Sequence, residues 1–158
     1  MAGALAGCGY QPVYAATGRH YEVVAGRYNT ASFEAVQEAA SGVRSELGAA
    51  EALGSGFPQV VVEVLRVDER SLGVRAVGDT PLARGSEIVV TGRARVLQSA
   101  GATSSYDSGD MSRAAQFAAG TTPGADAELR SRAVRDAARS LGRALGRAVL
   151  GLPEPAEG

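Results

Sequence analysis

Residues 87–97 carry the pattern that most constrains how this chain can fold. Apolar and polar side chains alternate there, the apolar set being Ile88, Val90, Ala94 and Val96 and the polar set Glu87, Thr91, Arg93 and Arg95. Because successive side chains of a strand point to opposite faces, one face of this strand is expected to pack and the other to meet water. The pattern predicts an antiparallel sheet covered by helices on one side only.

Other stretches supply the remaining strands. The sequence predicts a short strand at residues 20–25, a central strand at residues 60–67 and a poorly defined edge strand at residues 103–117. Residues 72–77 alternate again, so residues 68–71 are either a hairpin turn or a bulge within one long strand. Turn residues predict loops at 78–85 and 120–124.

Two stretches show helical periodicity. In the first, Thr30 or Ser32 can cap the start, Gly42 and Gly48 weaken the interior, and the apolar face comprises Phe33, Val36, Ala40, Val43 and Leu47. In the second, Asp126 is the expected N-cap and the helix runs to Leu150. Its apolar stripe is Val134, Ala138, Leu141, Leu145, Ala148 and Val149, and the expected opposite face is Arg132, Arg135, Arg139, Arg143 and Arg147.

The order of elements predicts an α+β fold. We expect a two-layer α/β sandwich in which two helices pack on one face of a four-stranded mixed sheet, in the order β-α-β-β-β-α. The predicted divisions are a residual signal segment at 1–7, a lipidated extended tether at 8–19, one sandwich domain at 20–151 and a flexible tail at 152–158.

Composition excludes several classes of function. With 158 residues, the chain has the length of one domain. Its net charge of −1 gives no overall positive electrostatic potential that would attract nucleic acid. No stretch approaches the length of a membrane-spanning helix. One histidine and one cysteine cannot build a His/Cys metal site, and no nucleophile–base pair or phosphate-binding glycine motif appears. We therefore expect no enzyme, no cofactor and no metal, with His20 a surface or packing residue and Asp107 and Asp110 in a solvated turn.

Arginine is the one extended charged feature of the chain. The stripe on the last helix is either a solvated face or a contact for anionic lipid head groups or an acidic partner, since arginine pairs bidentately with phosphate. On the polar face of the sheet, Arg93 and Arg95 are the candidates for contact with an anionic lipid or a partner.

The start of the sequence has the pattern of bacterial lipoprotein processing. In Leu5-Ala6-Gly7-Cys8, small residues precede a cysteine that can take a lipid. Only four residues come before Leu5, which is shorter than the apolar core of a secretory signal. We expect Cys8 to be lipidated and the true start codon to lie upstream, the alternative being a protein that is not exported.

The run "CGYQPVY", followed by this order of elements, resembles the lipopolysaccharide-assembly lipoprotein family (LptE), with Cys8, Gly9, Tyr10 and Pro12 as the matching residues. The resemblance implies a non-catalytic lipoprotein anchored to the periplasmic face of a Gram-negative outer membrane. It also implies a plug and assembly factor for an LptD-like β-barrel translocon, with that barrel and lipopolysaccharide as partners. The alternative is another periplasm-facing lipoprotein, such as a lipid-transporter auxiliary subunit or a cell-wall synthase activator.

Overall fold

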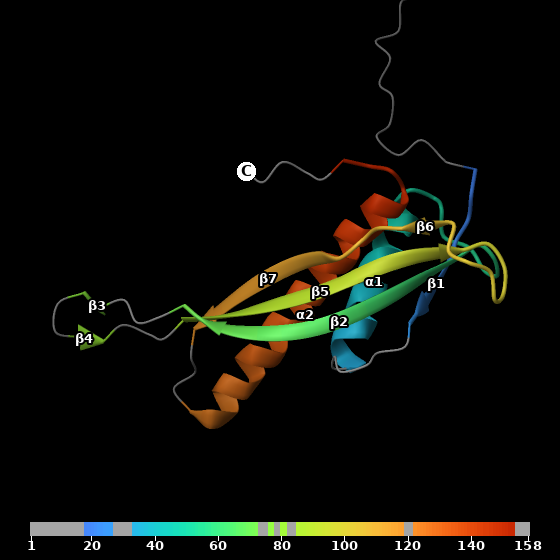
Figure 1. The fold of residues 1–158 in the computed structure, drawn as a ribbon. Helices are drawn as coiled ribbons and strands as arrows, with labels where there is room; N and C mark the ends of the chain where they lie inside the picture. The colour runs from blue at the N-terminus through green and yellow to red at the C-terminus, as the bar shows by residue number, and fades with distance from the viewer. Residues whose placement is uncertain are drawn as a thin grey trace, which may run out of the picture.

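The computed structural model describes residues 18–26, 33–72, 76–77, 80–81, 85–118 and 122–153. Along the chain, the elements are β1 (Glu22–Ala25), α1 (Phe33–Ala49), β2 (Gln59–Ser71), β3 (Ala76–Val77), β4 (Thr80–Pro81), β5 (Gly85–Leu97), β6 (Tyr106–Asp107), β7 (Met111–Ala118) and α2 (Pro123–Val149). Figure 1 shows β2 and β5 as the two long strands, with the β3–β4 pair beyond one end of them.

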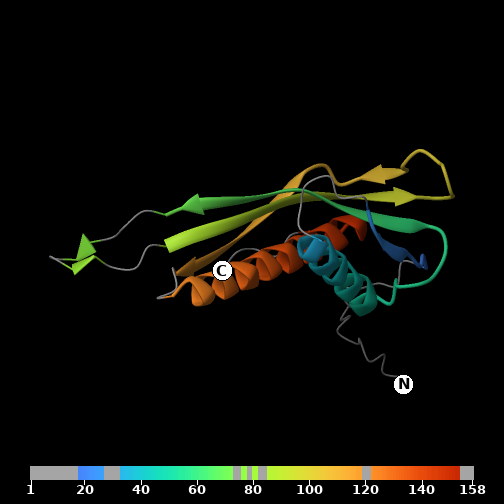
Figure 2. The same cartoon turned by 90° about the horizontal axis from the view of Figure 1, so that it is seen from below.

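The main sheet is mixed, and both helices lie on one of its faces (Figure 2). Within the described residues it has five strands: β1 is parallel to β2, β2 is antiparallel to β5, and β6 and β7 pair with successive parts of β5. The predicted α+β sandwich is confirmed. Its fifth strand arises because the expected edge strand at 103–117 is divided into β6 and β7 by residues 108–110.

The structure gives β2 as one bulged strand over residues 59–71, and the bulge lies at Leu65, outside the residues predicted for it. Val64 lies opposite Gly92 and Arg66 opposite Thr91, so Leu65 is the extra residue in β2. Residues 68–71 are neither turn nor bulge, because they continue the ladder opposite residues 89–86. The inserted residue exchanges the two faces of the strand beyond it, and this places Val67 against the core and turns Glu69 toward the helices.

The predicted loop at 78–85 is only partly a loop. Thr80 and Pro81 pair with Val77 and Ala76 in a separate two-stranded ladder, and β5 already begins at Gly85. The backbone amide of Leu72 donates to the carbonyl of Gly85, which closes the main ladder at that end.

The buried face of α1 follows the predicted period except at its first residue. Val36, Ala40, Val43 and Leu47 are fully buried. Phe33 was expected on this face and is 60% exposed, because it opens the helix ahead of the first turn that packs. The predicted caps Thr30 and Ser32 lie outside the described residues.

The start of α2 corrects another prediction, since Asp126 is not the N-cap. The cap is Thr122, whose hydroxyl accepts from the amide of Ala125 at 3.3 Å, and Pro123 follows it. Proline suits the first helical position because it has no amide hydrogen to satisfy and its φ angle is already helical. Asp126 lies within the first turn, where its charge still favours the helix dipole.

Thr91 corrects the prediction of a uniformly wet sheet face. It is only 7% exposed, and its hydroxyl lies 2.8 Å from the hydroxyl of Ser112 on β7. The ladder between β5 and β7 places these two residues opposite each other, so β7 covers a position that the isolated strand pattern assigns to water.

The two helices approach so closely that side chains larger than hydrogen do not fit at their crossing. A Cβ atom built at Gly142 would lie 2.0 Å from the carbonyl oxygen of Ala39, and one at Gly42 would lie 2.5 Å from the carbonyl oxygen of Arg139. Gly42, which was predicted to weaken α1, is therefore the residue that allows α1 to approach α2 closely.

We predict that Gly142→Ala lowers the free energy of unfolding by about 1–3 kcal/mol, because its methyl group would force the helices apart. The matched control is Gly48→Ala, since a Cβ atom at Gly48 meets nothing within 4 Å. This control should raise stability by up to about 1 kcal/mol through helix propensity alone. Urea denaturation of both variants checks the prediction, which fails if both changes stabilise the protein.

Candidate functional site

The two arginines predicted to contact a lipid or a partner meet on the outer face of the sheet, the face away from the helices. The ladder of β2 and β5 sets Glu63 opposite Arg93, and Arg95 lies one pleat further along. Arg93 Nε lies 3.3 Å from Glu63 Oε2, and Arg95 Nη2 donates to Glu63 Oε1. Asp107 on β6 approaches Arg93 Nη1 at 3.9 Å. Two carboxylates thus face two guanidinium groups in one cluster.

This outer-face cluster, Glu63, Arg93, Arg95 and Asp107, is neutral and only partly open to water. The side chain of Glu63 is 15% exposed, whereas those of the two arginines are 36% and 39% exposed. The Nε atoms of both arginines are buried and make no aligned hydrogen bond, although Arg93 Nε is close to Glu63. The cluster offers a polar surface, and contact of Arg93 and Arg95 with an anionic lipid or partner stays a prediction.

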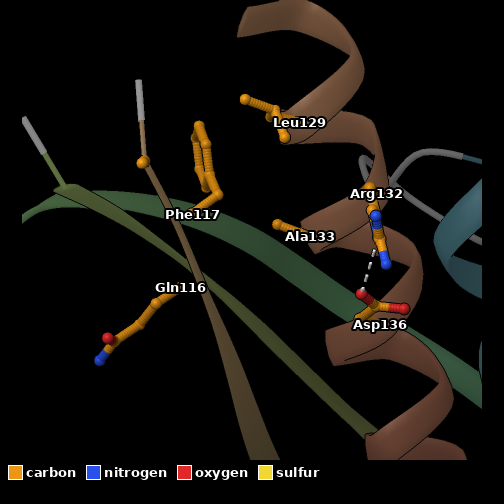
Figure 3. A pocket seen from close by; sticks show the side chains of 7 residues that line it. Gln116, Phe117, Leu129, Arg132, Ala133 and Asp136 are labelled. Carbon is orange, nitrogen blue, oxygen red and sulfur yellow. Dashed lines mark ion pairs between the residues drawn. The ribbon is translucent and has the colours of Figure 1, made fainter. Parts of the chain in front are cut away.

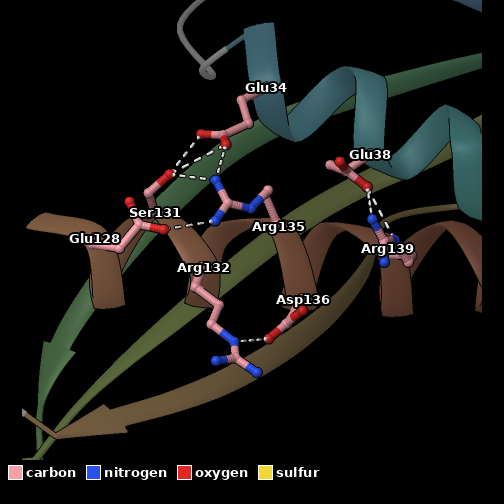
Figure 4. A network of polar contacts seen from close by, with 8 residues as sticks. All are labelled: Glu34, Glu38, Glu128, Ser131, Arg132, Arg135, Asp136 and Arg139. Carbon is pink, nitrogen blue, oxygen red and sulfur yellow. Dashed lines mark hydrogen bonds and ion pairs between the residues drawn. The ribbon is translucent and has the colours of Figure 1, made fainter.

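The arginine stripe of α2 is largely a contact within the protein. Arg135 Nη1 donates to Glu34 Oε1 at 2.8 Å, and Arg139 donates to Glu38 Oε2 through Nη2 at 2.7 Å and Nε at 3.0 Å (Figure 4). Arg147 Nη1 lies 3.8 Å from Glu46 Oε2. These pairs follow the same order along both helices, so α1 and α2 run parallel. We call the three pairs the interhelical ladder.

Additional contacts extend the ladder at its first pair. Ser131 donates to both oxygens of Glu34 at 3.2 Å, and Glu128 accepts from Arg135 Nη2 at 3.3 Å. The hydrogen bond to Glu34 raises the pKa of the Arg135 guanidinium above its ordinary value. Arg132 instead faces Asp136 of its own helix at 3.9 Å.

The sequence analysis predicted that these arginines form either a solvated face or a contact for a lipid or partner, and neither prediction included a contact with α1. Arg135, Arg139 and Arg147 were expected to point away from the packed face, and the structure turns them toward α1. The sequence does contain a signal for these pairs. The glutamates at 34, 38 and 46 have the same spacing along the chain as the arginines at 135, 139 and 147. Long side chains can keep their stems on an apolar helix contact while their charged ends meet beside it.

The residues considered for chemistry do not come together. His20 lies exposed at the start of the described chain, and Asp107 Oδ1 accepts from the amide of Gly109 at 2.9 Å, as expected for a turn. In the part of the chain that the structure describes, no three His, Cys, Asp or Glu side chains are grouped to hold a metal ion. Cys8 lies outside the described residues.

Tyr106 joins the short edge strand β6 to the end of α2. Its hydroxyl donates to the carbonyl oxygen of Ala148 at 3.1 Å. Burial, followed by the nearby charge of Asp107, raises the pKa of Tyr106 above its ordinary value. The contact fixes the last turn of α2 against the sheet.

A shallow cleft of about 340 Å³ lies between β7 and α2 (Figure 3). Phe117, Leu129 and Ala133 give it an apolar floor, and the Arg132–Asp136 pair stands at its rim. Its seven lining residues include no nucleophile paired with a base. Among the described helices, none is long and apolar enough to cross a membrane.

Comparisons with known proteins find similarity in structure only. No protein-family model matches the chain, and no curated protein matches it significantly. Two similar solved structures are a minor lipoprotein from Acinetobacter baumannii and the rare lipoprotein B from Shewanella oneidensis. The first is 12% identical, covers 90% of this chain and 99% of its own, and has a TM-score of 0.47. The second is 9% identical, covers 82% and 94%, and has a TM-score of 0.48. Since both TM-scores are below 0.5, we base neither family nor function on them.

We predict that Arg139 and Glu38 stabilise the protein together. A double-mutant cycle with Arg139→Ala and Glu38→Ala should give a coupling energy of about 0.2–1 kcal/mol, which decreases in high salt. In a control cycle, Arg143→Ala and Glu38→Ala should be additive. Equal coupling in both cycles would show that the interhelical ladder does not hold as described.

Proposed function

We propose that the chain is a lipid-anchored protein of the outer membrane that acts as a plug and assembly factor of the lipopolysaccharide-transport β-barrel, as its resemblance to the LptE family implies. The observation that carries the proposal is the run Leu5-Ala6-Gly7-Cys8, continued by Gly9, Tyr10 and Pro12, ahead of one small sandwich domain. In this proposal, Cys8 holds the membrane anchor and the domain does the binding.

The outer face of the sheet is the surface that we propose to meet the barrel. It carries the neutral outer-face cluster, a further pair between Arg66 and Asp68 at 3.0 Å, and small exposed side chains such as Ala114 on β7. The interior of a transmembrane β-barrel is polar, and a polar surface with internally paired charges can pack there without leaving a buried charge uncompensated. The polar outer face of the sheet would thus be complementary to the polar interior of a barrel, and this supports the proposal.

The proposed role is structural and not enzymatic. The sequence holds one histidine and one cysteine, and the cysteine is assigned to the lipid. Binding through shape and many polar contacts needs no reactive group, so the proposal assigns no catalytic, metal or cofactor residue.

The anchor is tested by producing the chain in a Gram-negative host with a lipoprotein signal peptide joined ahead of Leu5. We expect the unchanged chain to incorporate palmitate and to fractionate with the outer membrane. Cys8→Ser should be soluble in the periplasm or unprocessed, because the lipid supplies the stable membrane attachment. Mass spectrometry that finds a free thiol on Cys8 in the mature unchanged protein would rule out the anchor.

The partner is tested by affinity capture of the lipidated protein from outer membranes of its native host. We expect a large β-barrel protein to be recovered, and depletion of the chain to lower lipopolysaccharide at the cell surface. Ala114→Arg should reduce recovery of the barrel, because it adds a long charged side chain to the outer face. Arg132→Ala on the exposed side of α2 is the control and should leave recovery unchanged.

Recovery of an inner-membrane transporter or a cell-wall synthase, with no barrel protein, would contradict the plug function. It would favour instead the auxiliary-subunit or synthase-activator alternative. Equal recovery of the barrel by the Ala114→Arg variant would contradict the assignment of the outer sheet face as the contact.

A further inference from the structure

The interhelical ladder is interrupted at one position. Arginines recur on α2 at 135, 139, 143 and 147, but the α1 residue that corresponds to Arg143 is Gly42. Gly42 cannot carry a carboxylate, since even a Cβ atom there would meet the backbone of α2. Within the described residues, Arg143 consequently makes no hydrogen bond or ion pair, in contrast to its neighbours on the stripe.

Arg143 lines a depression of about 320 Å³ in which other positive groups gather. Its lining residues come from α1, β7 and α2, and they are Glu46, Arg113, Ser140, Arg143, Ala144 and Arg147. The lining thus includes three arginines and one carboxylate. Glu46 Oε2 lies 3.8 Å from Arg147 Nη1, and Arg113 Nη1 donates to the carbonyl of Ser112. The lining residues carry more formal positive than negative charge, although the chain as a whole has a net charge of −1. We call it the arginine depression.

The polar groups of the arginine depression match a tetrahedral oxyanion. Arginine presents its N–H donors in a planar fork that suits two oxygens of a phosphate, and the hydroxyl of Ser140 can donate to a third. Glu46 Oε2 is buried and has no hydrogen-bond partner in the described part of the chain. A protonated phosphate oxygen, which a monoester carries below its second pKa of about 6, would supply that hydrogen bond.

We propose that the arginine depression binds a phosphate monoester group, with Arg143 as its principal ligand and with Arg113, Arg147 and Ser140 around it. The group can come from a soluble phosphate or from the head group of a membrane lipid, because both present the same oxyanion. This site lies on the helix side of the molecule and does not depend on the barrel-plug function.

The test uses the full chain, not lipidated, with two probes. Inorganic phosphate is titrated calorimetrically in a phosphate-free buffer, and binding to phosphatidylcholine vesicles with and without phosphatidic acid is measured by sedimentation. Arg143→Ala should weaken binding by about tenfold or more, because a charge-assisted bidentate contact is lost. Arg143→Lys should lie between this variant and the unchanged chain, since lysine keeps the charge and loses the fork.

Arg132→Ala is the matched control, because Arg132 is an exposed arginine of the same helix that does not line the depression. It should bind like the unchanged chain. Binding of inorganic phosphate that is lost in Arg143→Ala supports a soluble source, and loss confined to phosphatidic acid vesicles supports a lipid source. Binding of neither probe, or equal weakening by Arg143→Ala and Arg132→Ala, would overturn the proposal.

Discussion

The close parallel contact between α1 and α2 is the constraint on which the rest of the structure depends. Backbone meets backbone at Gly42 and Gly142, where any side chain would collide with the other helix. This contact turns two helices of modest intrinsic stability into one layer. That layer covers the sheet, with α2 over β5 and β7 and α1 over β1 and β2. Packing, more than helix propensity, therefore supplies the stability of this layer.

The same contact decides where the arginines go. Helices that meet through glycine and alanine leave room beside the contact for long side chains, and the carboxylates of α1 reach the guanidinium groups of α2 there. Glycine at position 42 serves the close approach and also removes the carboxylate that Arg143 would meet. One residue type thus explains both the regularity of the interhelical ladder and its interruption.

Much of the fold could be predicted from periodicity alone. The apolar positions of α1 and α2 and the alternation at Val90 and its neighbours gave the layers and their facing sides, because burial follows the period of each element. Local patterns were misleading at the start of α2, where Asp126 was predicted as the cap and Thr122 holds that position. They were also misleading at Thr91, which a neighbouring strand covers. The bulge at Leu65 could not be predicted, because no residue type there marks a bulge. The interhelical ladder could not be predicted, because the sequence of each helix alone does not show which helix it packs against or whether the two run parallel.

The distance along the sequence between the paired helices also bears on how the protein is made. Arg135 and Arg139 lie 101 residues after the glutamates that they bind. Contacts between such distant segments must wait for nearly the whole chain, and folding dominated by them is slow. During synthesis, α1 emerges with its acidic row and its glycine-bearing face uncovered, and it cannot acquire its partner until the last helix is released. The helix layer is therefore among the last parts of this fold that can be completed during synthesis.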